Sequence, residues 1–309
     1  MAMMIYAGDR DVTPWVEALR AVDDSMDIRI YPDIGDKRDI IFGLTWQYPV
    51  GLWSEYPNLR ALSSIGAGVS HILDDETIGR DISILKLTDS RLNQSMWEYL
   101  LSTISYQAMQ LQHYRYQQSD SHWQERVPRG FDSVTVGIFG LGSIGSYVAK
   151  HLVELGFRVK GFATTYKSVD GVDVYSADMV TYRVLQSLDI VVSILPLTAS
   201  TIGFFDSTFF DRLSSGASII NVGRGAQIVE DDLIQALDSG QLSHAWLDVF
   251  EQEPLDKHHP FWSHPKISIT PHIASITDPM SVAPQIVENY HALVDGLPMR
   301  NVVDRSRGY

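Results

Sequence analysis

Three observations predict an α/β protein in which one parallel-sheet domain is inserted into another. Short apolar segments alternate with helix-like stretches from the start of the chain, as in a parallel α/β layer. A second series of the same kind begins at Ser133, after a long stretch without Gly or Pro. A last helical stretch follows this second series. The order predicts one domain formed by residues 1–98 plus 278–309 and a second domain formed by residues 99–277.

The first series contains five apolar strand candidates. We place them at residues 3–7, 27–31, 40–44, 62–65 and 82–87. In the stretch from 92 to 127, which lacks Gly and Pro, apolar residues recur at spacings of three and four. This spacing predicts one long helix with an apolar face, which we interpret as core packing. The residues of that face are Trp97, Leu101, Ile104, Ala108 and Leu111.

The second series predicts a complete doubly wound sheet. Its strands are expected at residues 135–139, 158–162, 190–195, 218–222, 245–249 and 267–270. Helices fit between them, notably at 143–155 and 230–237. The last helix is expected at 279–294. We therefore expect the second domain to be a self-contained layer of parallel strands with helices on its faces.

Composition excludes several classes of protein. A hydrophobic content of 45% and a charged content of 20% fit a globular protein, and no apolar run approaches the roughly eighteen residues of a membrane span. Asp9 and Arg10 come too early for a signal-peptide core, which favours a cytoplasmic location. The net charge of −14 argues against nucleic acid, although local cations still allow a small anionic substrate.

The sequence offers no metal site. It contains no cysteine, which excludes a disulfide scaffold, thiolate ligands and a cysteine nucleophile, and suits a reducing compartment. Three histidines crowd one loop without a regular ligand spacing, so we interpret that loop as solvated. They are His258, His259 and His264.

A glycine signature lies between the first strand and the first helix of the second series. Gly140 permits the tight turn, Gly142 lets the backbone approach a pyrophosphate, and Gly145 allows the helix to pack close to the strand. The N–H groups of Ser143 and Ile144 then point at the phosphates from a helix N-terminus. The alternative is a tight turn without a ligand. This context predicts a Rossmann-type dinucleotide-binding domain.

The end of the next strand lacks the acid that usually binds the adenosine ribose of NAD. No carboxylate occurs between 154 and 170, and Ala163 removes the repulsion that an acid would exert on a 2′-phosphate. Thr164 and Thr165 can donate hydroxyl hydrogen bonds, and Lys167 supplies positive charge, with Lys160 or Arg158 as further candidates. We predict that NADPH is preferred over NADH, with NADH as an alternative. The basic cluster could otherwise be a solvated surface turn.

Three candidate catalytic residues each follow a predicted strand of this domain, where side chains of a doubly wound sheet face the ligand crevice. They are Arg224, Glu253 and His272. His272 can donate a proton to a carbonyl oxygen that receives negative charge, and a carboxylate on its other nitrogen would orient the ring. Arg224 can hold an α-keto acid with its fork geometry. Glu251 shares the strand parity of Glu253, so the local pattern does not choose between them.

With these residues the sequence resembles the D-isomer-specific 2-hydroxyacid dehydrogenases over nearly the whole chain. The C-terminal V-D-R-S-R-G-Y and I-T-P-H-I-A-S-I-T resemble the glyoxylate/hydroxypyruvate reductase A branch in particular. The shared motifs are G-A-G-V at 66–69, G-L-G-S-I-G at 140–145, L-P-L-T at 195–198, N-V-G-R-G at 221–225, D-V-F-E-Q-E-P at 248–254 and T-P-H-I-A at 270–274.

The resemblance implies roles for individual residues. Arg224 corresponds to the substrate-binding arginine, His272 to the acid/base, and Glu253, which precedes a proline, to the carboxylate of the dyad. Pro196 and Asp248 fall among the cofactor-pocket positions. The backbone at Gly68 and Val69 would receive the substrate carboxylate. The first domain would then be a smaller, flavodoxin-like α/β substrate domain.

The resemblance also implies an activity. Members of this branch reduce glyoxylate to glycolate and hydroxypyruvate to D-glycerate, usually with NADPH, and the resemblance implies a homodimer. A bulkier or phosphorylated 2-keto acid is an alternative substrate. A dinucleotide-sensing binding protein is an alternative from another functional class.

Three aromatic or imidazole side chains have two interpretations each. Trp46 and Trp97 could line the pocket against the substrate's small tail or could pack in the core. His71, just after the expected carboxylate loop, could touch the substrate or serve in packing. Of these three, we predict only Trp46 to bind the substrate.

Overall fold

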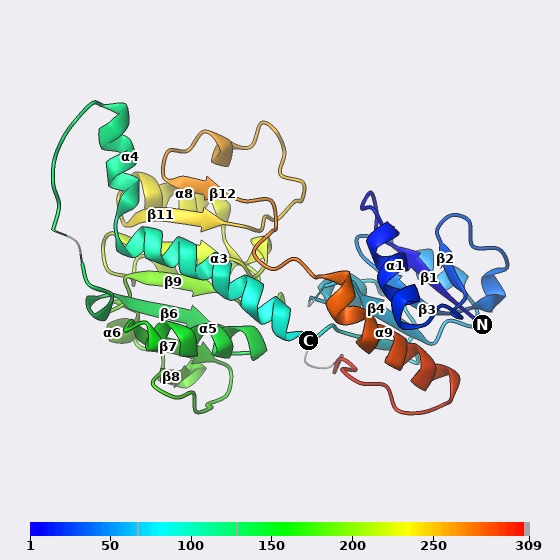
Figure 1. Ribbon diagram of the computed structural model, residues 1–309. Helices are drawn as coiled ribbons and strands as arrows, with labels where there is room; N and C mark the ends of the chain where they lie inside the picture. The colour runs from blue at the N-terminus through cyan, green and yellow to red at the C-terminus, as the bar shows by residue number, and fades with distance from the viewer. Residues whose placement is uncertain (67, 128, 306–309) are drawn as a thin grey trace. The chain divides into compact units, whose positions relative to one another are not determined.

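The computed structural model describes residues 1–66, 68–127 and 129–305. Ala67 of the G-A-G-V motif and residues 306–309 of the C-terminal motif lie outside the described residues. The chain divides into two compact units, Met1–Leu92 with the residues from Ile276 on, and Asn93–Ser275. Each unit is a parallel sheet with helices, as Figure 1 shows. The predicted α/β class, with a doubly wound domain inserted into a smaller one, is confirmed.

The first unit contains a five-stranded sheet in the order β2-β1-β3-β4-β5, with every pair parallel. This is the flavodoxin-like order, in which the strand sequence reverses beside β1. Met3 lies opposite Ile28 of β2 and Phe42 of β3. The strands are β1 (Ala2–Tyr6), β2 (Ile28–Ile30), β3 (Ile40–Thr45), β4 (Ala61–Ser64) and β5 (Ser83–Leu85).

Helices cover this sheet because alternate strand residues are apolar on both faces. α1 (Thr13–Val22) and α9 (Pro279–Val294) pack on each other, and their buried Leu19 and Ile286 share a core cluster with Ile5 of β1. The neighbouring Met4 belongs to a second cluster with Trp53 and Ile72, the latter from the short α2 (Ser70–Leu73). The early strands and the returning helix therefore form one core.

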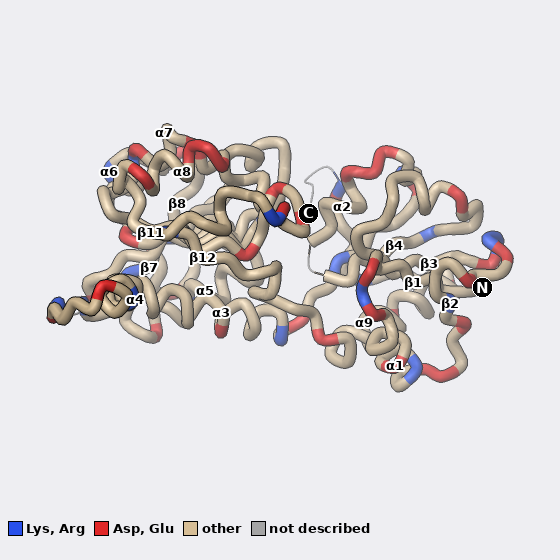
Figure 2. Tube along the Cα trace, turned by 90° about the horizontal axis from the view of Figure 1, so that it is seen from above, with Lys and Arg blue, Asp and Glu red and all other residues tan. Residues whose placement is uncertain are grey.

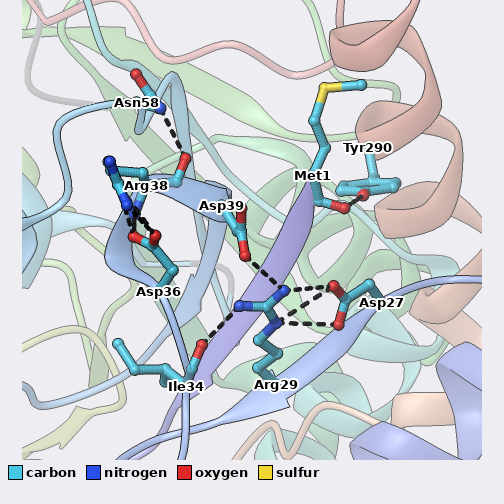
Figure 3. Close-up of polar contacts among 9 residues, drawn as sticks. All are labelled: Met1, Asp27, Arg29, Ile34, Asp36, Arg38, Asp39, Asn58 and Tyr290. Carbon is cyan, nitrogen blue, oxygen red and sulfur yellow. Dashed lines mark hydrogen bonds and ion pairs between the residues drawn. The ribbon is translucent and has the colours of Figure 1, made fainter.

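Polar side chains tie β2 and the start of β1 to neighbouring segments. Arg29 donates to the carboxylates of Asp27 and Asp39 at 2.7 and 2.9 Å, and to the carbonyl oxygen of Ile34 (Figure 3). In the same view the Tyr290 hydroxyl of α9 donates to the Met1 carbonyl oxygen at 2.9 Å. The guanidinium fixes the loop that follows β2, and the tyrosine ties α9 to the start of β1.

The second unit contains a seven-stranded parallel sheet in the order β12-β11-β10-β9-β6-β7-β8. The order reverses between β6 and β9, which is the position where ligands bind in doubly wound sheets. The strands are β6 (Thr135–Phe139), β7 (Arg158–Ala163), β8 (Asp173–Ser176), β9 (Ile190–Ser193), β10 (Ala217–Asn221), β11 (Leu242–Leu247) and β12 (Ile267–Ile269).

Both faces of this sheet are buried. Ile220 of β10 packs in the cluster that contains α3 (Ser90–Ala108) and α5 (Ser143–Glu154), whereas the neighbouring Ile219 packs in the cluster of α7 (Ser207–Phe210) and α8 (Glu230–Asp238). The remaining helices of this unit are α4 (Leu111–Ser119) and α6 (Tyr182–Leu185). Trp97 of α3 is only 8% exposed and lies in the first of these clusters, as its core interpretation requires.

The predicted long helix is present as α3, but it is shorter than its expected apolar face, which extends to Leu111. α3 ends at Ala108, Gln110 has a left-handed backbone with φ of +54°, and the separate α4 has no buried residue. Leu111, the last residue of the predicted apolar face, is 40% exposed. The absence of Gly and Pro permits a helix but does not stabilise one, because helices in proteins depend mainly on packing of an apolar face.

One strand was missed in the sequence. β8 is a four-residue edge strand in which Val174 and Ser176 are buried while Asp173 is exposed. Its brevity and mixed polarity give little apolar signal, so it is hard to distinguish from a loop.

Acidic residues lie on both units, and Figure 2 shows a run of them at the start of α8. There Glu230, Asp231 and Asp232 occupy the first turn, where the helix dipole favours negative charge. Among the described residues no helix combines the length and apolar character that crossing a membrane requires.

Candidate active site

The glycine turn connects β6 to α5 and has two kinds of glycine. A Cβ on Gly140, whose φ is +103°, would lie 2.7 Å from the Ile194 carbonyl oxygen, and one on Gly145 would lie 1.9 Å from the Gly140 oxygen. Packing therefore demands both. A Cβ on Gly142 would meet no atom within 4 Å. The space beside Gly142 adjoins the first turn of α5, whose N–H groups lack intrahelical acceptors and suit a phosphate.

A pocket of about 430 Å³ lies beside that helix N-terminus. Lys167 reaches it from the loop after β7, and its Nζ donates to the Ser146 hydroxyl at 2.7 Å. Burial lowers the pKa of Lys167. Thr164 and Thr165 are exposed and are not among the residues that line the pocket, so their role stays a prediction. The lining residues are Asn93, Ser143, Ser146, Tyr147, Lys150, Lys167, Ser168, Val169 and Asp170.

Lys150 is a pocket residue that the sequence interpretation missed. A signal was present, because Ser143, Ser146, Tyr147 and Lys150 follow helical spacing from the glycine turn and so share one face of α5. Asp170 brings one carboxylate to the same pocket, at the far end of the acid-free window. Two cations and one acid thus surround this space.

The loop after β9 lies next to the glycine turn in the fold. The Pro196 carbonyl oxygen accepts hydrogen bonds from the Thr201 hydroxyl at 2.7 Å and from the Gln227 amide at 3.1 Å. The Ile194 oxygen is the atom that a side chain on Gly140 would strike. Two predicted cofactor segments, at 140–145 and at Pro196, therefore meet at the carboxyl edge of the sheet.

Asp248 is buried at the end of β11, with 1% exposure. Its carboxylate accepts hydrogen bonds from the Thr270 hydroxyl at 2.6 Å and from the N–H groups of Ile273 and Ala274 at 2.8 and 2.9 Å. The Tyr99 hydroxyl of α3 bonds to the same Thr270 hydroxyl at 2.7 Å. In this structure the visible contacts of Asp248 hold the loop that carries His272, and contact with a cofactor stays a prediction.

His272 and Glu253 form a hydrogen-bonded pair. The His272 Nδ1 lies 2.7 Å from Glu253 Oε2, and the Phe250 N–H donates to Glu253 Oε1 at 3.1 Å. The His272 backbone has a φ of +55°, and its N–H donates to the Asp248 carbonyl oxygen at 2.8 Å. Of the two glutamates that the local pattern left open, Glu253 is the one that bonds to the ring, whereas Glu251 is exposed.

The electrostatics of this pair favour the carboxylate form of Glu253. Burial is the largest influence and raises its pKa, but the hydrogen bond and charge of His272, the Phe250 N–H and the charge of Arg224 together lower the pKa below its ordinary value. Burial lowers the pKa of the Arg224 guanidinium, and the charge of Glu253 opposes that shift. The opposite charges of Arg224 and Glu253 thus stabilise each other.

The loop that carries Arg224 packs directly on the loop that carries Glu253. A Cβ on Gly225 would lie 1.8 Å from the Phe250 carbonyl carbon, so only glycine fits there. The Arg224 Nη1 donates to the Gly223 carbonyl oxygen at 2.7 Å. Arg224, Glu253 and His272 therefore come from three neighbouring loops at the carboxyl edge of one sheet.

The predicted substrate-binding residues belong to the first unit. Trp46 follows β3 and is 8% exposed; the Arg10 guanidinium carbon lies 4.8 Å from its ring centre, and the His71 ring lies 4.8 Å away. Both interpretations of Trp46 and His71 are compatible with these contacts.

The expected carboxylate-binding backbone follows β4. The Gly68 carbonyl oxygen accepts a hydrogen bond from the Ser64 hydroxyl at 2.7 Å, and Val69 is buried. A Cβ on Gly66 would lie 3.0 Å from the Trp46 ring, so this loop packs on that tryptophan. Trp46, Gly68 and Val69 thus lie together at the carboxyl edge of the five-stranded sheet, and their role stays a prediction.

The histidines of the 258–264 loop make local contacts. His259 lies 3.0 Å from the Glu230 carboxylate, and His264 lies 3.3 Å from that of Asp238. The backbone N–H of His258 donates to Asp256 at 2.7 Å. Within the described ranges, no group of three or more His, Cys, Asp or Glu side chains is arranged to hold a metal ion.

Comparisons with known proteins agree with this geometry. Residues 101–274 match the family model of the D-isomer specific 2-hydroxyacid dehydrogenase, NAD binding domain. The chain is 34% identical to the glyoxylate/hydroxypyruvate reductase A of Yersinia enterocolitica, with 100% of both chains covered.

Solved structures show the same fold. A D-isomer specific 2-hydroxyacid dehydrogenase of Xanthobacter autotrophicus in complex with NADPH and MES has a TM-score of 0.93 at 34% identity, covering 100% of this chain and 99% of that one. An NADPH-dependent glyoxylate/hydroxypyruvate reductase of Sinorhizobium meliloti in complex with NADP and sulfate has a TM-score of 0.92 at 29% identity, with the same coverage. The resemblance is thereby confirmed, and the chain belongs to the D-isomer-specific 2-hydroxyacid dehydrogenases, a family of NAD(P)-dependent enzymes.

Proposed function

We propose that this protein is an NADPH-dependent reductase of small 2-keto acids, converting glyoxylate to glycolate and hydroxypyruvate to D-glycerate. The main support for the proposal is the 2.7 Å contact between His272 and Glu253. The loop that carries Glu253 packs on the loop that carries Arg224. The names of the Yersinia and Sinorhizobium relatives support the substrate class.

The three side chains divide the chemistry between them. The nicotinamide cofactor, when bound, supplies a hydride to the keto carbon. His272 delivers a proton to the keto oxygen from Nε2, because Nδ1 is engaged by Glu253. Glu253 stabilises the imidazolium before transfer and fixes the ring. Arg224 binds the substrate carboxylate and keto oxygen and offsets the negative charge that develops there.

The fit of the protein to a dinucleotide rests on the open space at Gly142. Because no atom would oppose a Cβ there, protein packing does not explain the glycine, whereas close approach of a pyrophosphate does. In the adjacent pocket, Lys167 and Lys150 supply positive charge for a 2′-phosphate, and Ser143 supplies a hydroxyl donor. This arrangement supports NADPH over NADH, as do the NADPH and NADP present in the related structures.

The two units take different parts in this proposal. Residues 99–277 bind the dinucleotide, and residues 1–98 plus 278–309 bind the substrate through Trp46 and the backbone at Gly68 and Val69. A homodimer and a cytoplasmic location complete the proposal; the dimer follows from the family resemblance alone, and the location is supported by a chain without cysteine.

The test is the oxidation of NADPH by purified protein with glyoxylate or hydroxypyruvate. We expect activity with both acids, a smaller kcat/KM with NADH, and loss of turnover in His272→Ala with NADPH affinity retained. Activity confined to bulkier or phosphorylated 2-keto acids would replace the substrate assignment but keep the chemistry. If no 2-keto acid is turned over, the proposed reductase function is refuted and a dinucleotide-sensing protein is favoured.

A further inference from the structure

Gln227 is a fully buried polar residue that the chemistry above does not use. It lies three residues after Arg224, in the turn that leads to α8, and its side chain is 0% exposed. A buried primary amide is costly unless its hydrogen bonds are made, so its partners indicate what it holds.

All the partners of the Gln227 amide belong to two segments at the carboxyl edge of the sheet. Its Oε1 accepts hydrogen bonds from the Ser193 hydroxyl at 2.9 Å and from the backbone N–H of Arg224 at 3.2 Å. Its Nε2 donates to the carbonyl oxygens of Leu195 at 2.8 Å and Pro196 at 3.1 Å. One amide thus joins the end of β9 to the backbone of Arg224 across the gap between two neighbouring strands.

The surrounding packing leaves this amide little freedom to move. A Cβ on Gly223 would lie 2.6 Å from Gln227 Oε1 and 2.9 Å from the Leu195 oxygen, so the loop before Arg224 is pressed against both groups. The side chain of Asn221 secures the other side of this loop, donating from Nδ2 to the Arg224 carbonyl oxygen at 2.9 Å and accepting from the Gly223 N–H at 3.0 Å. Arg224 therefore has its backbone fixed at both its N–H and its carbonyl group.

We infer that Gln227 is a positioning residue that couples the Arg224 clamp to the Pro196 cofactor loop. The inference rests on the proposed roles of these two segments. Gln227 touches neither substrate nor cofactor; it sets the place of the two groups that would do so. Because misplacement of a binding group by about 1 Å can reduce a rate on the order of a hundredfold, loss of this link is expected to reach both ligands.

The chain offers a matched control in Gln241. Its Nε2 also donates to two carbonyl oxygens, those of Phe210 at 2.8 Å and Leu213 at 3.1 Å. It precedes β11 and so lies at the amino edge of the same sheet, whereas Gln227 lies at the carboxyl edge. Gln241→Leu removes a comparable pair of bonds without touching the proposed site.

The experiment compares Gln227→Leu, Gln227→Glu and Gln241→Leu in the full chain. We expect Gln227→Leu to weaken NADPH binding roughly tenfold by fluorescence titration and to lower kcat/KM for hydroxypyruvate on the order of tenfold to a hundredfold at saturating NADPH. Gln227→Glu keeps the acceptor for Ser193 and Arg224 but repels the two carbonyl oxygens, so it should weaken NADPH binding more than substrate binding. Gln241→Leu should lower Tm while leaving both constants within about twofold of wild type.

Two further measurements separate this inference from the proposed function. In an Arg224→Ala background, Gln227→Leu should cause no additional fall in residual kcat/KM at saturating NADPH, because the clamp it positions is gone. Amide hydrogen exchange, which needs no ligand, should quicken in residues 193–198 and 221–228 together in Gln227→Leu and not in Gln241→Leu. If the wild type reduces no 2-keto acid, the proposed function fails. Amide hydrogen exchange still tests whether Gln227 couples residues 193–198 to residues 221–228.

Several outcomes would overturn the inference. They are unchanged exchange in either segment, NADPH and substrate constants within about twofold of wild type in Gln227→Leu, and equal kinetic losses in Gln241→Leu at an equal change in Tm. If Gln227→Leu does not fold, Gln227→Glu decides the question by the same measurements.

Discussion

Buried polar side chains have different hydrogen-bond partners at the two edges of the seven-stranded sheet. At the carboxyl edge, the side chains of Asp248 and Gln227 bond to backbone groups of the loops that carry His272 and Arg224. At the amino edge, the buried His244 bonds to the Ser268 hydroxyl through Nε2, while its Nδ1 and the Gln107 amide nitrogen have no hydrogen-bond partner within the part of the chain that the structure describes.

The difference indicates where this fold needs accurate geometry. A buried carboxylate or amide with several backbone partners fixes a loop, since each partner lost leaves another buried group unsatisfied. The groups at the amino edge line a smaller pocket of about 140 Å³ and connect no loops of the proposed site. Substitutions at the carboxyl edge should therefore change stability and activity together, and those at the amino edge should change stability alone.

The largest effect is expected for Asp248→Ala. The change leaves the Thr270 hydroxyl and two backbone N–H groups without their acceptor, so the free energy of unfolding should fall by about 3–5 kcal/mol. The loop with His272 would shift, and kcat/KM should fall on the order of a hundredfold. Urea unfolding and steady-state kinetics measure the two effects. A stable variant with normal kinetics would remove the distinction between the two edges.

A smaller effect, confined to stability, is expected from His244. Burial, with a contribution from His264, lowers the pKa of His244 to about 4 from an ordinary value of 6.5. Between pH 4 and pH 6.5, His244 therefore binds a proton in the unfolded chain but not in the folded chain. The stability that neutral His244 allows is fully present above pH 6.5, and the free energy of unfolding decreases as pH falls toward 4. The loss corresponds to about 3 kcal/mol.

The check is urea unfolding of the wild type and of His244→Gln from pH 7 to pH 4. The variant should show a flatter pH dependence over that range, with kcat/KM near that of the wild type at pH 7. Parallel pH profiles for the two proteins would show that His244 already titrates normally in the folded state.

The sequence predicted the carboxyl edge better than the amino edge for a physical reason. Arg224, Glu253 and His272 follow apolar strands of recognisable period, and parallel strands bring their carboxyl ends to one side. At the amino edge, α3 ends where the apolar face loses its packing partner, although neither Gly nor Pro marks the place. Tertiary contacts of this kind cannot be obtained from local periodicity.

Within the site, residues with local signals were easier to identify than those that depend on packing. Gly140 and Gly145 occupy a motif, whereas Lys150 needed its helical spacing to be followed along α5. Gln227 caps the N–H of Arg224 three residues earlier, a spacing that resembles half of a capping box, but its bonds to Leu195 and Pro196 depend on the sheet order.

The pocket beside α5 permits a narrower test of the carboxyl edge. Lys167→Ala should raise the KM for NADPH roughly tenfold to a hundredfold and leave that for NADH unchanged, because a charge-assisted bond to a phosphate is worth about 1.5–3 kcal/mol. Lys160→Ala is the control, since Lys160 donates to the Ser187 hydroxyl at 2.7 Å and does not line the pocket. Equal losses for both cofactors, or for both variants, would mean that Lys167 does not recognise the 2′-phosphate.

The smallest effect is expected beyond α4, where Figure 1 shows the chain standing away from the seven-stranded sheet. Trp123 there is 93% exposed and Val127 is 92% exposed. Since an exposed side chain contributes little to the folded chain, Trp123→Ala should change the free energy of unfolding by less than about 0.5 kcal/mol at low protein concentration. Urea unfolding at several concentrations measures this. A loss that grows with concentration would show that another copy of the chain covers Trp123, and would extend the contrast between the sheet edges to the proposed homodimer.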